Sequence, residues 1–118
     1  MKRQAQNGFT MIEILISLFV LCVVLLAIST MVFSVMRATS QSKEMATATT
    51  IVQDKLENLK NTSVGSLVSG NDSLNLGNIT YLRQWIVSTA GNIKTITVSV
   101  NWNSRGTHNV SMTTLRGD

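Results

Sequence analysis

The chain of 118 residues contains no proline, one cysteine and one histidine. Without proline, no position forces a break in a helix, so long uninterrupted helices are permitted. The single cysteine, Cys22, cannot form an intrachain disulfide, so a small domain must be held together by packing and polar contacts. The single histidine, His108, lies near a turn signal and has no metal-ligand pattern around it. We expect it to be a solvated turn residue, and we expect no metal site.

Charged residues are also scarce, at 14% of the chain, and the formal net charge is +4. No cluster of Lys and Arg follows residue 8, so the charge indicates no nucleic-acid surface. In residues 61–118 the only carboxylate or imidazole side chains are Asp72, His108 and Asp118. These are too few for a catalytic constellation. We therefore expect no catalytic residues, no enzyme and no cofactor.

A 23-residue stretch without a charged side chain, residues 14–36, is the main feature that is present. As a helix it measures about 35 Å, enough to cross a hydrocarbon core of about 30 Å. It is too long for the apolar region of a secretory signal peptide, and too little of the remaining chain is apolar to bury it in a soluble core. Lys2 and Arg3 favour a cytoplasmic N-terminus, although Arg37 and Lys43 on the other side weaken this bias.

One carboxylate, Glu13, stands at the N-terminal edge of this stretch. An acid within a membrane costs up to about 2.5–3.5 kcal/mol at the bilayer centre and less near the interface. Taken alone, Glu13 is consistent with a snorkelling side chain without a function. It ends, however, the run Gly8-Phe9-Thr10-Met11-Ile12-Glu13, which follows a short basic leader.

This run, placed ahead of an apolar helix, resembles the prepilin signature that type IV pilins share with the pseudopilins of type II secretion. The signature combines a glycine at the end of the leader, an aromatic residue after it and an acid at the fifth position after the cut. The resemblance implies that residues 1–8 are a leader, removed by a prepilin peptidase that cleaves between Gly8 and Phe9 and methylates the amino group of Phe9. Lys2 and Arg3 would hold the leader in the cytoplasm.

The resemblance also implies an assembly role for Glu13, whose carboxylate would pair with the Phe9 amine of a neighbouring subunit. The expected partners are the peptidase, other pilin or pseudopilin subunits, an inner-membrane assembly platform and, before assembly, membrane lipid. The expected location is the bacterial inner membrane, crossed once with a cytoplasmic N-terminus, and then a periplasmic or extracellular filament. Nucleic acid is not expected among the partners.

The helical pattern continues beyond the apolar stretch. Residues 9–36 are predicted to form the transmembrane and filament-core segment of one long helix, and residues 37–60 its amphipathic continuation. Along this continuation, a single face is marked by Met45, Thr49, Val52, Leu56 and Leu59, at helical spacing. Residues 61–79 are rich in Gly, Ser and Asn, which predicts a loop.

Residues 80–118 show strand patterns. Ile96, Val98, Val100 and Trp102 alternate strictly with polar residues, and turn signals lie at 90–92 and 103–107. The predicted fold class is α+β and pilin-like: one long N-terminal helix whose second half packs on a small three-stranded antiparallel sheet. Trp85 and Trp102 are expected in the core of this packing.

The expected function is that of a structural subunit, a minor pilin or minor pseudopilin, of a type IV pilus or a type II secretion pseudopilus. The small size and the missing disulfide favour a minor over a major subunit. The alternative is a DNA-capturing pilin of a competence system. It would need an exposed cationic or aromatic surface, and the only cations in residues 61–118 are Arg83, Lys94, Arg105 and Arg116.

Overall fold

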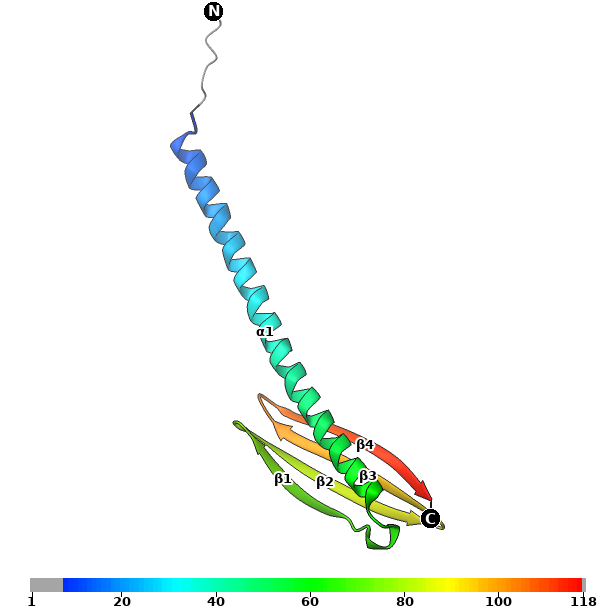
Figure 1. Cartoon of the computed structure of the whole chain (residues 1–118). Coiled ribbons are helices and arrows are strands. Elements are labelled where there is room, and N and C mark those ends of the chain that lie inside the picture. The colour runs from blue at the N-terminus through cyan, green and yellow to red at the C-terminus, as the bar shows by residue number, and fades with distance from the viewer. Residues whose placement is uncertain (1–7, 118) are drawn as a thin grey trace, which may run out of the picture. The chain divides into compact units, whose positions relative to one another are not determined.

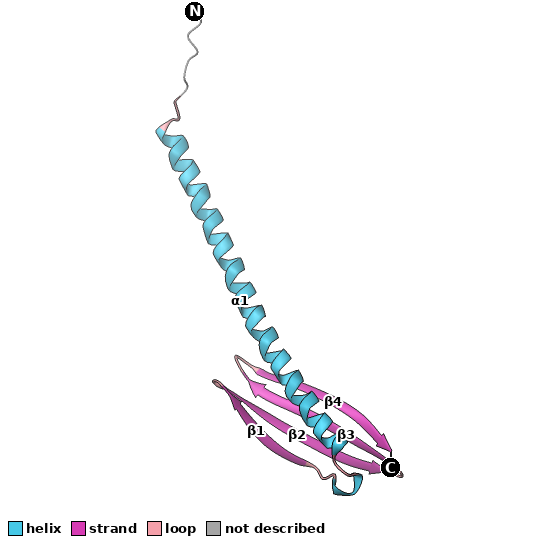
Figure 2. Cartoon of the chain, in the orientation of Figure 1, coloured by secondary structure: helices cyan, strands magenta, loops and turns pink. Residues whose placement is uncertain are grey.

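A computed structural model describes residues 8–117 of the chain, so Lys2 and Arg3 lie outside the described residues (Figures 1 and 2). The chain forms two compact units, which meet within a helix after Ser40. The elements in chain order are helix α1 (Met11–Asn61), a 3₁₀ turn η1 (Val64–Ser66) and strands β1 (Gly70–Leu76), β2 (Ile79–Ala90), β3 (Ile93–Asn103) and β4 (Thr107–Gly117).

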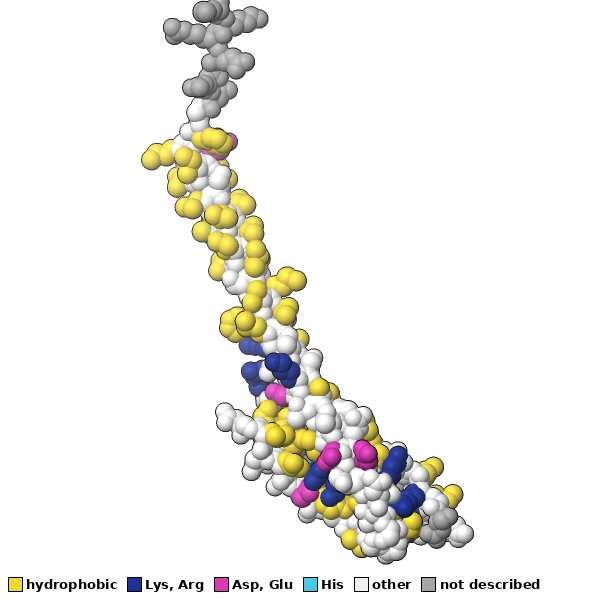
Figure 3. All heavy atoms as spheres, in the orientation of Figure 1, with side chains coloured by type: hydrophobic (Ala, Val, Ile, Leu, Met, Phe, Trp, Pro, Cys, Tyr) yellow, Lys and Arg dark blue, Asp and Glu magenta, His cyan; other side chains and the backbone are white. Residues whose placement is uncertain are grey.

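The first unit contains the apolar segment of α1. Its large apolar side chains from Met11 to Met36 are 47–84% exposed, so no side of this segment is buried by the chain itself. Figure 3 shows these hydrophobic side chains along the helix. The hydroxyls of Ser17, Ser29 and Thr30 donate to helix carbonyls at 2.8 Å, which satisfies them without water. Within residues 8–117, α1 is the one helix long and apolar enough to cross a membrane.

The second unit carries a four-stranded antiparallel sheet with the strand order β1-β2-β3-β4. Each strand is joined to the next by a short loop. Two of these loops begin with glycine in the left-handed region, Gly77 at φ 63° and Gly91 at φ 61°. That conformation at the first loop residue matches the right-handed twist of a tight hairpin.

The prediction of an α+β fold with one long helix and an antiparallel sheet is confirmed, but the predicted number of strands, three, is wrong. The fourth strand, β1, lies within residues 61–79, for which the sequence predicts a loop. Its sequence, Gly-Asn-Asp-Ser-Leu-Asn-Leu, is poor in strand-forming residues. It forms a strand because each of its residues pairs with a residue of β2, from Gly70 opposite Trp85 to Leu76 opposite Ile79.

The core lies between the C-terminal end of α1 and one face of the sheet. Ala48 and Val52 on the helix are fully buried, and Trp102 is buried as predicted. The predicted apolar stripe was partly wrong, because Met45 is 42% exposed and Ala48 takes the central place. The buried apolar residues are Ala48, Ile51, Val52, Leu59, Leu67, Tyr81, Ile96, Val98, Val100 and Trp102.

An ionic cluster fastens β1 to β2 and to the helix. Arg83 donates two hydrogen bonds to Asp72, at 2.7 and 2.5 Å, and the Lys55 ammonium lies 3.9 Å from the same carboxylate. The hydrogen bond and charge of Arg83 lower the pKa of Asp72. The Lys55 ammonium also stands 3.6 Å above the ring of Trp85, whose indole N–H donates to the Val68 carbonyl.

Two further polar contacts join the helix to the strands. The Glu44 carboxylate accepts hydrogen bonds from the Trp102 indole at 3.3 Å and from the Ser104 hydroxyl at 2.8 Å. The Nη1 nitrogen of Arg116 donates to the carbonyls of Leu59 and Lys60 in the last turn of α1 and of Thr62 just beyond it, so one of its two N–H groups is shared between two acceptors. These bonds satisfy helix-end carbonyls that have no partner within the helix. They connect residues more than fifty positions apart.

Candidate processing and assembly site

The residues of the predicted cleavage site lie just outside the helix. Gly8, Phe9 and Thr10 are exposed and have no regular secondary structure, and α1 begins at Met11. Phe9 is 78% exposed. A Cβ atom added to Gly8 would meet nothing within 4 Å. The packing of this chain therefore does not require glycine at position 8, and any requirement for it comes from a molecule that binds there.

Thr10 determines where the helix begins. The backbone N–H of Glu13 lies 3.0 Å from the Thr10 carbonyl and 3.4 Å from its hydroxyl, and the N–H of Ile14 lies 3.2 Å from the same carbonyl. Thr10 is thus the N-cap, and Glu13 is the third helical residue. The spacing Thr-x-x-Glu is that of a capping box. This role of Thr10 was not predicted, although the signal is present in the run Thr10-Met-Ile-Glu13.

The cap has a consequence for the bond between Gly8 and Phe9. Because hydrogen bonding of the helix starts at Thr10, the bond stays outside the helical ladder. Peptide hydrolysis requires a backbone that can lie extended in an enzyme cleft. The bond lies two residues ahead of α1 and is not part of regular secondary structure, so no helical hydrogen bond has to break before it can enter such a cleft.

Glu13 lies in the first turn of α1, and its side chain is exposed. A negative charge is favourable at this end of a helix, because the backbone N–H groups there carry a partial positive charge. Between residues 8 and 117, the salt bridges involve only Asp72 with Lys55 and Arg83, so none reaches Glu13. The carboxylate is therefore available to a cation from outside this range of residues.

The described residues contain no group of three or more His, Cys, Asp or Glu side chains that would hold a metal ion. The expectation that His108 is solvated was wrong. It lies on the inward face of β4 opposite Trp102, is half-buried and stacks on that indole with ring centroids 5.3 Å apart. Cys22 is exposed on the apolar segment of α1.

Three of the four cations considered for DNA binding are bonded within the second unit. Arg83 binds Asp72, Lys94 donates to the Val64 carbonyl, and Arg116 binds the end of α1. Arg105, in the turn between β3 and β4, is exposed. Trp102 is buried and Trp85 is half-buried beneath Lys55, so neither indole offers a free stacking face.

A comparison with known families finds the prokaryotic N-terminal methylation motif at residues 3–29. The matched segment contains Gly8, Phe9, Thr10 and Glu13 and ends within the apolar segment of α1. No curated protein and no solved structure matches the chain. The motif thus covers the predicted cleavage and assembly residues, and the sheet lies outside it.

Proposed function

We propose that this chain, which carries the N-terminal methylation signature of the type IV pilin and pseudopilin family, is a minor structural subunit of a type IV pilus or a type II secretion pseudopilus. One observation supports this above all others. A non-helical Gly8–Phe9 bond precedes a capped helix that has an acid in its first turn and an exposed apolar surface behind it.

In the proposed maturation, a prepilin peptidase hydrolyses the bond between Gly8 and Phe9. The leader leaves with a new carboxylate on Gly8, and Phe9 gains an amino group, which the same enzyme methylates. Lys2 and Arg3 keep the leader on the cytoplasmic side of the inner membrane. Before assembly, lipid covers the apolar segment of α1, which crosses the membrane once.

In the proposed assembly, Glu13 pairs with the Phe9 amine of a neighbouring subunit. Phe9 lies four positions before Glu13, and in the proposed filament, where the helix continues to Phe9, this spacing corresponds to about 6 Å along the helix axis. A neighbour displaced axially by this amount brings its amine level with the carboxylate. Other positions leave the acid without a partner in an apolar surrounding, so the pair selects one register. An inner-membrane assembly platform would supply and receive the subunits.

A minor role is favoured by the construction of the second unit. It closes a small core without a disulfide, through the contacts of Asp72, Glu44 and Arg116. The alternative of a DNA-capturing pilin draws no support from this unit, because three of its four cations after residue 61 serve internal bonds.

The experiment combines mass spectrometry of sheared filaments with three variants. The wild-type chain should begin at N-methyl-Phe9 and occur in a low ratio to a main subunit. Glu13→Ala and Glu13→Gln should both be inserted and cleaved but absent from filaments. Gln also occurs at this position of capping boxes, so Glu13→Gln separates loss of charge from loss of the cap. The exposed Glu57→Ala on α1 is the matched control.

An intact Met1 or Lys2 terminus on the filament subunit would refute the processing step. Normal incorporation of Glu13→Gln would refute the ion pair and leave only a capping role for Glu13.

A further inference from the structure

The sheet face turned away from α1 carries no charged side chain. Along each strand, residues alternate between the face that packs on the helix and this outer face. All four charged residues of the strands belong to the helix side: Asp72, Arg83, Lys94 and Arg116. The outer face is formed by Asn71, Ser73, Asn75, Thr80, Leu82, Gln84, Ile86, Ser88, Ala90, Ile93, Thr95, Thr97, Ser99, Asn101, Asn103, Thr107, Asn109, Ser111, Thr113 and Leu115.

Across β3 and β4, side chains of the same kind stand opposite each other on this face. Asn109 donates to Asn101 at 2.6 Å, the hydroxyls of Thr97 and Thr113 are 3.1 Å apart, and Ser99 faces Ser111 across the strands. Neighbouring strands lie about 4.8 Å apart and successive pairs about 6.7 Å along the strand. The result is a regular array of amides and hydroxyls, each able both to donate and to accept hydrogen bonds.

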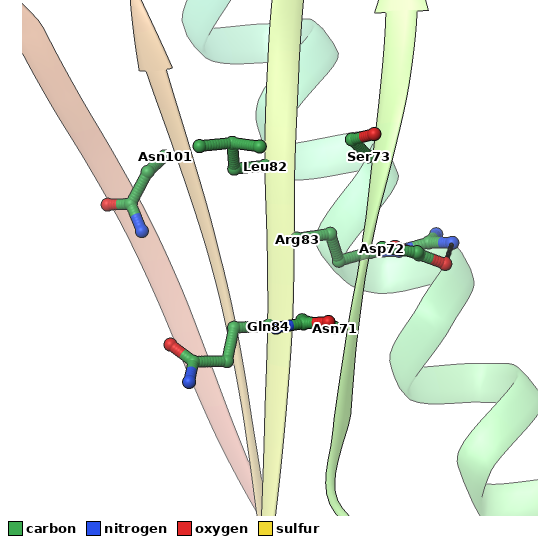
Figure 4. Close-up of a pocket in the computed structure, with 7 residues that line it drawn as sticks. All are labelled: Asn71, Asp72, Ser73, Leu82, Arg83, Gln84 and Asn101. Atoms are coloured by element: carbon green, nitrogen blue, oxygen red, sulfur yellow. Dashed lines mark hydrogen bonds and ion pairs between the residues drawn. The ribbon is translucent and has the colours of Figure 1, made fainter.

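Two shallow depressions lie on this array. One, of about 410 Å³, is bordered on the outer face by Asn71, Ser73, Leu82, Gln84 and Asn101 (Figure 4). Asp72 and Arg83 also border it, but their charged ends bind each other. The other depression, of about 380 Å³, adds Asn78, Thr80, Trp102, Asn103 and Thr107, although Trp102 is only 3% exposed and its side chain belongs to the helix side.

The two depressions share Leu82 and Asn101, so they are neighbouring regions of one surface. Leu82 is 57% exposed and offers an apolar ridge between them.

We propose that this face binds a neutral, hydroxyl-rich polysaccharide. Sugar hydroxyls need groups that donate and accept without bringing charge, and this array supplies both. A polyanion would need cations, and the face has none. A protein partner would need a buried aromatic or Arg anchor, whereas the aromatic residues of the strands lie on the helix side. This face offers only aliphatic side chains, of which Ala90 and Ile93 stand opposite each other at one end. An extended polymer would contact both depressions along the strands and cover Leu82 with its C–H groups.

The test uses the full-length chain in lipid nanodiscs, applied to amylose, cellulose and galactomannan matrices. We expect retention on at least one of them that does not depend on salt. Gln84→Ala and Asn101→Ala should each weaken it about fivefold, as expected for one lost hydrogen bond. Gln84 is exposed, so its loss leaves the core intact. The matched controls, Gln53→Ala and Asn58→Ala, change exposed residues on α1 and should bind like the wild type.

Three outcomes would overturn the inference. The first is no retention on any neutral matrix, or equal retention of all four variants. The second is retention on heparin that falls with salt, which would indicate a polyanion. The third is concentration-dependent dimerisation abolished by the sheet variants, which would make the face an interface between copies. Cleavage and filament incorporation are measured separately, so failure here leaves the proposed function standing, and the reverse also holds.

Discussion

Replacing Arg116 by alanine should destabilise the second unit more than any other single change of a surface cation. Arg116 is half-buried, and its guanidinium donates to two carbonyls of the last turn of α1 and to that of Thr62, just beyond the helix, at 2.6 Å. It also lies at the negative end of the helix dipole. No other group among residues 8–117 makes as many bonds between the last strand and the helix.

The magnitude follows from these contacts. A hydrogen bond to a charged group contributes about 1.5–3 kcal/mol, and the favourable dipole adds about 0.3–1 kcal/mol. The carbonyls regain some hydration once the side chain is removed, so we expect a net loss of about 2–3 kcal/mol. A domain of this size has on the order of 5 kcal/mol of stability in total. The variant should therefore be folded at low temperature but close to its unfolding midpoint under physiological conditions.

The assay is urea unfolding of the full-length chain in detergent, followed by tryptophan fluorescence. Both tryptophans, Trp85 and Trp102, belong to the second unit, so the signal reports that unit alone. With a slope of about 1.5 kcal/mol per M, the midpoint should fall by about 1–2 M. The matched control is Arg105→Ala, an exposed turn residue, which should change little. Equal shifts for the two variants would refute the stabilising role assigned to Arg116.

Two further substitutions test the packing of β1. Gly70→Ala should cost about 1–3 kcal/mol, because the new Cβ would stand 2.6 Å from the ring of Trp85, while Gly65→Ala, with open space around it, should be neutral in the same unfolding assay. Asp72→Asn should flatten the acid side of the stability profile. The pKa of Asp72 is lowered by Arg83, so its carboxylate contributes stability above its unfolded pKa, and this contribution is lost as the pH falls through the lower folded value. As the pH falls below about 4, the wild type should lose up to about 1 kcal/mol more than Asp72→Asn, a modest amount because the site is partly solvated; parallel profiles would contradict the assignment.

The long helix and the three later strands could be predicted because their periodicity is local. Residues 96–102 alternate with period two, and the helix has neither proline nor glycine from Met11 to Asn61. β1 could not, because its residues favour loops and become a strand only against β2. Ala48 was not predicted for a related reason: its small side chain is only weakly apolar, and its complete burial depends on the sheet that packs against the helix.

The cations show the limit of sequence analysis more sharply. Nothing local to Arg116 indicates that it binds a carbonyl at residue 59, since that contact depends on how the last strand reaches the helix end. From the sequence alone, Lys94 and Arg83 are candidates for a nucleic-acid surface. In the structure, Lys94 binds the Val64 carbonyl and Arg83 binds Asp72. The spacing of charged residues along the chain does not show which other residues their side chains contact in the folded sheet.

The residues of the run from Gly8 to Glu13 fall into two groups: those that the fold of this chain needs and those that it does not. Thr10 and the backbone of Glu13 serve the fold of this chain, because they start α1. Gly8 and Phe9 serve no packing contact, since a Cβ on Gly8 meets nothing and Phe9 is 78% exposed. Both residues lie within the N-terminal methylation motif, which supports the proposal that another molecule recognises them. The Glu13 carboxylate has features of both groups. Its negative charge is favourable at the N-terminus of the helix, yet no described cation pairs with it. Its negative charge goes beyond what the helix requires, and that charge is what an assembling neighbour would use.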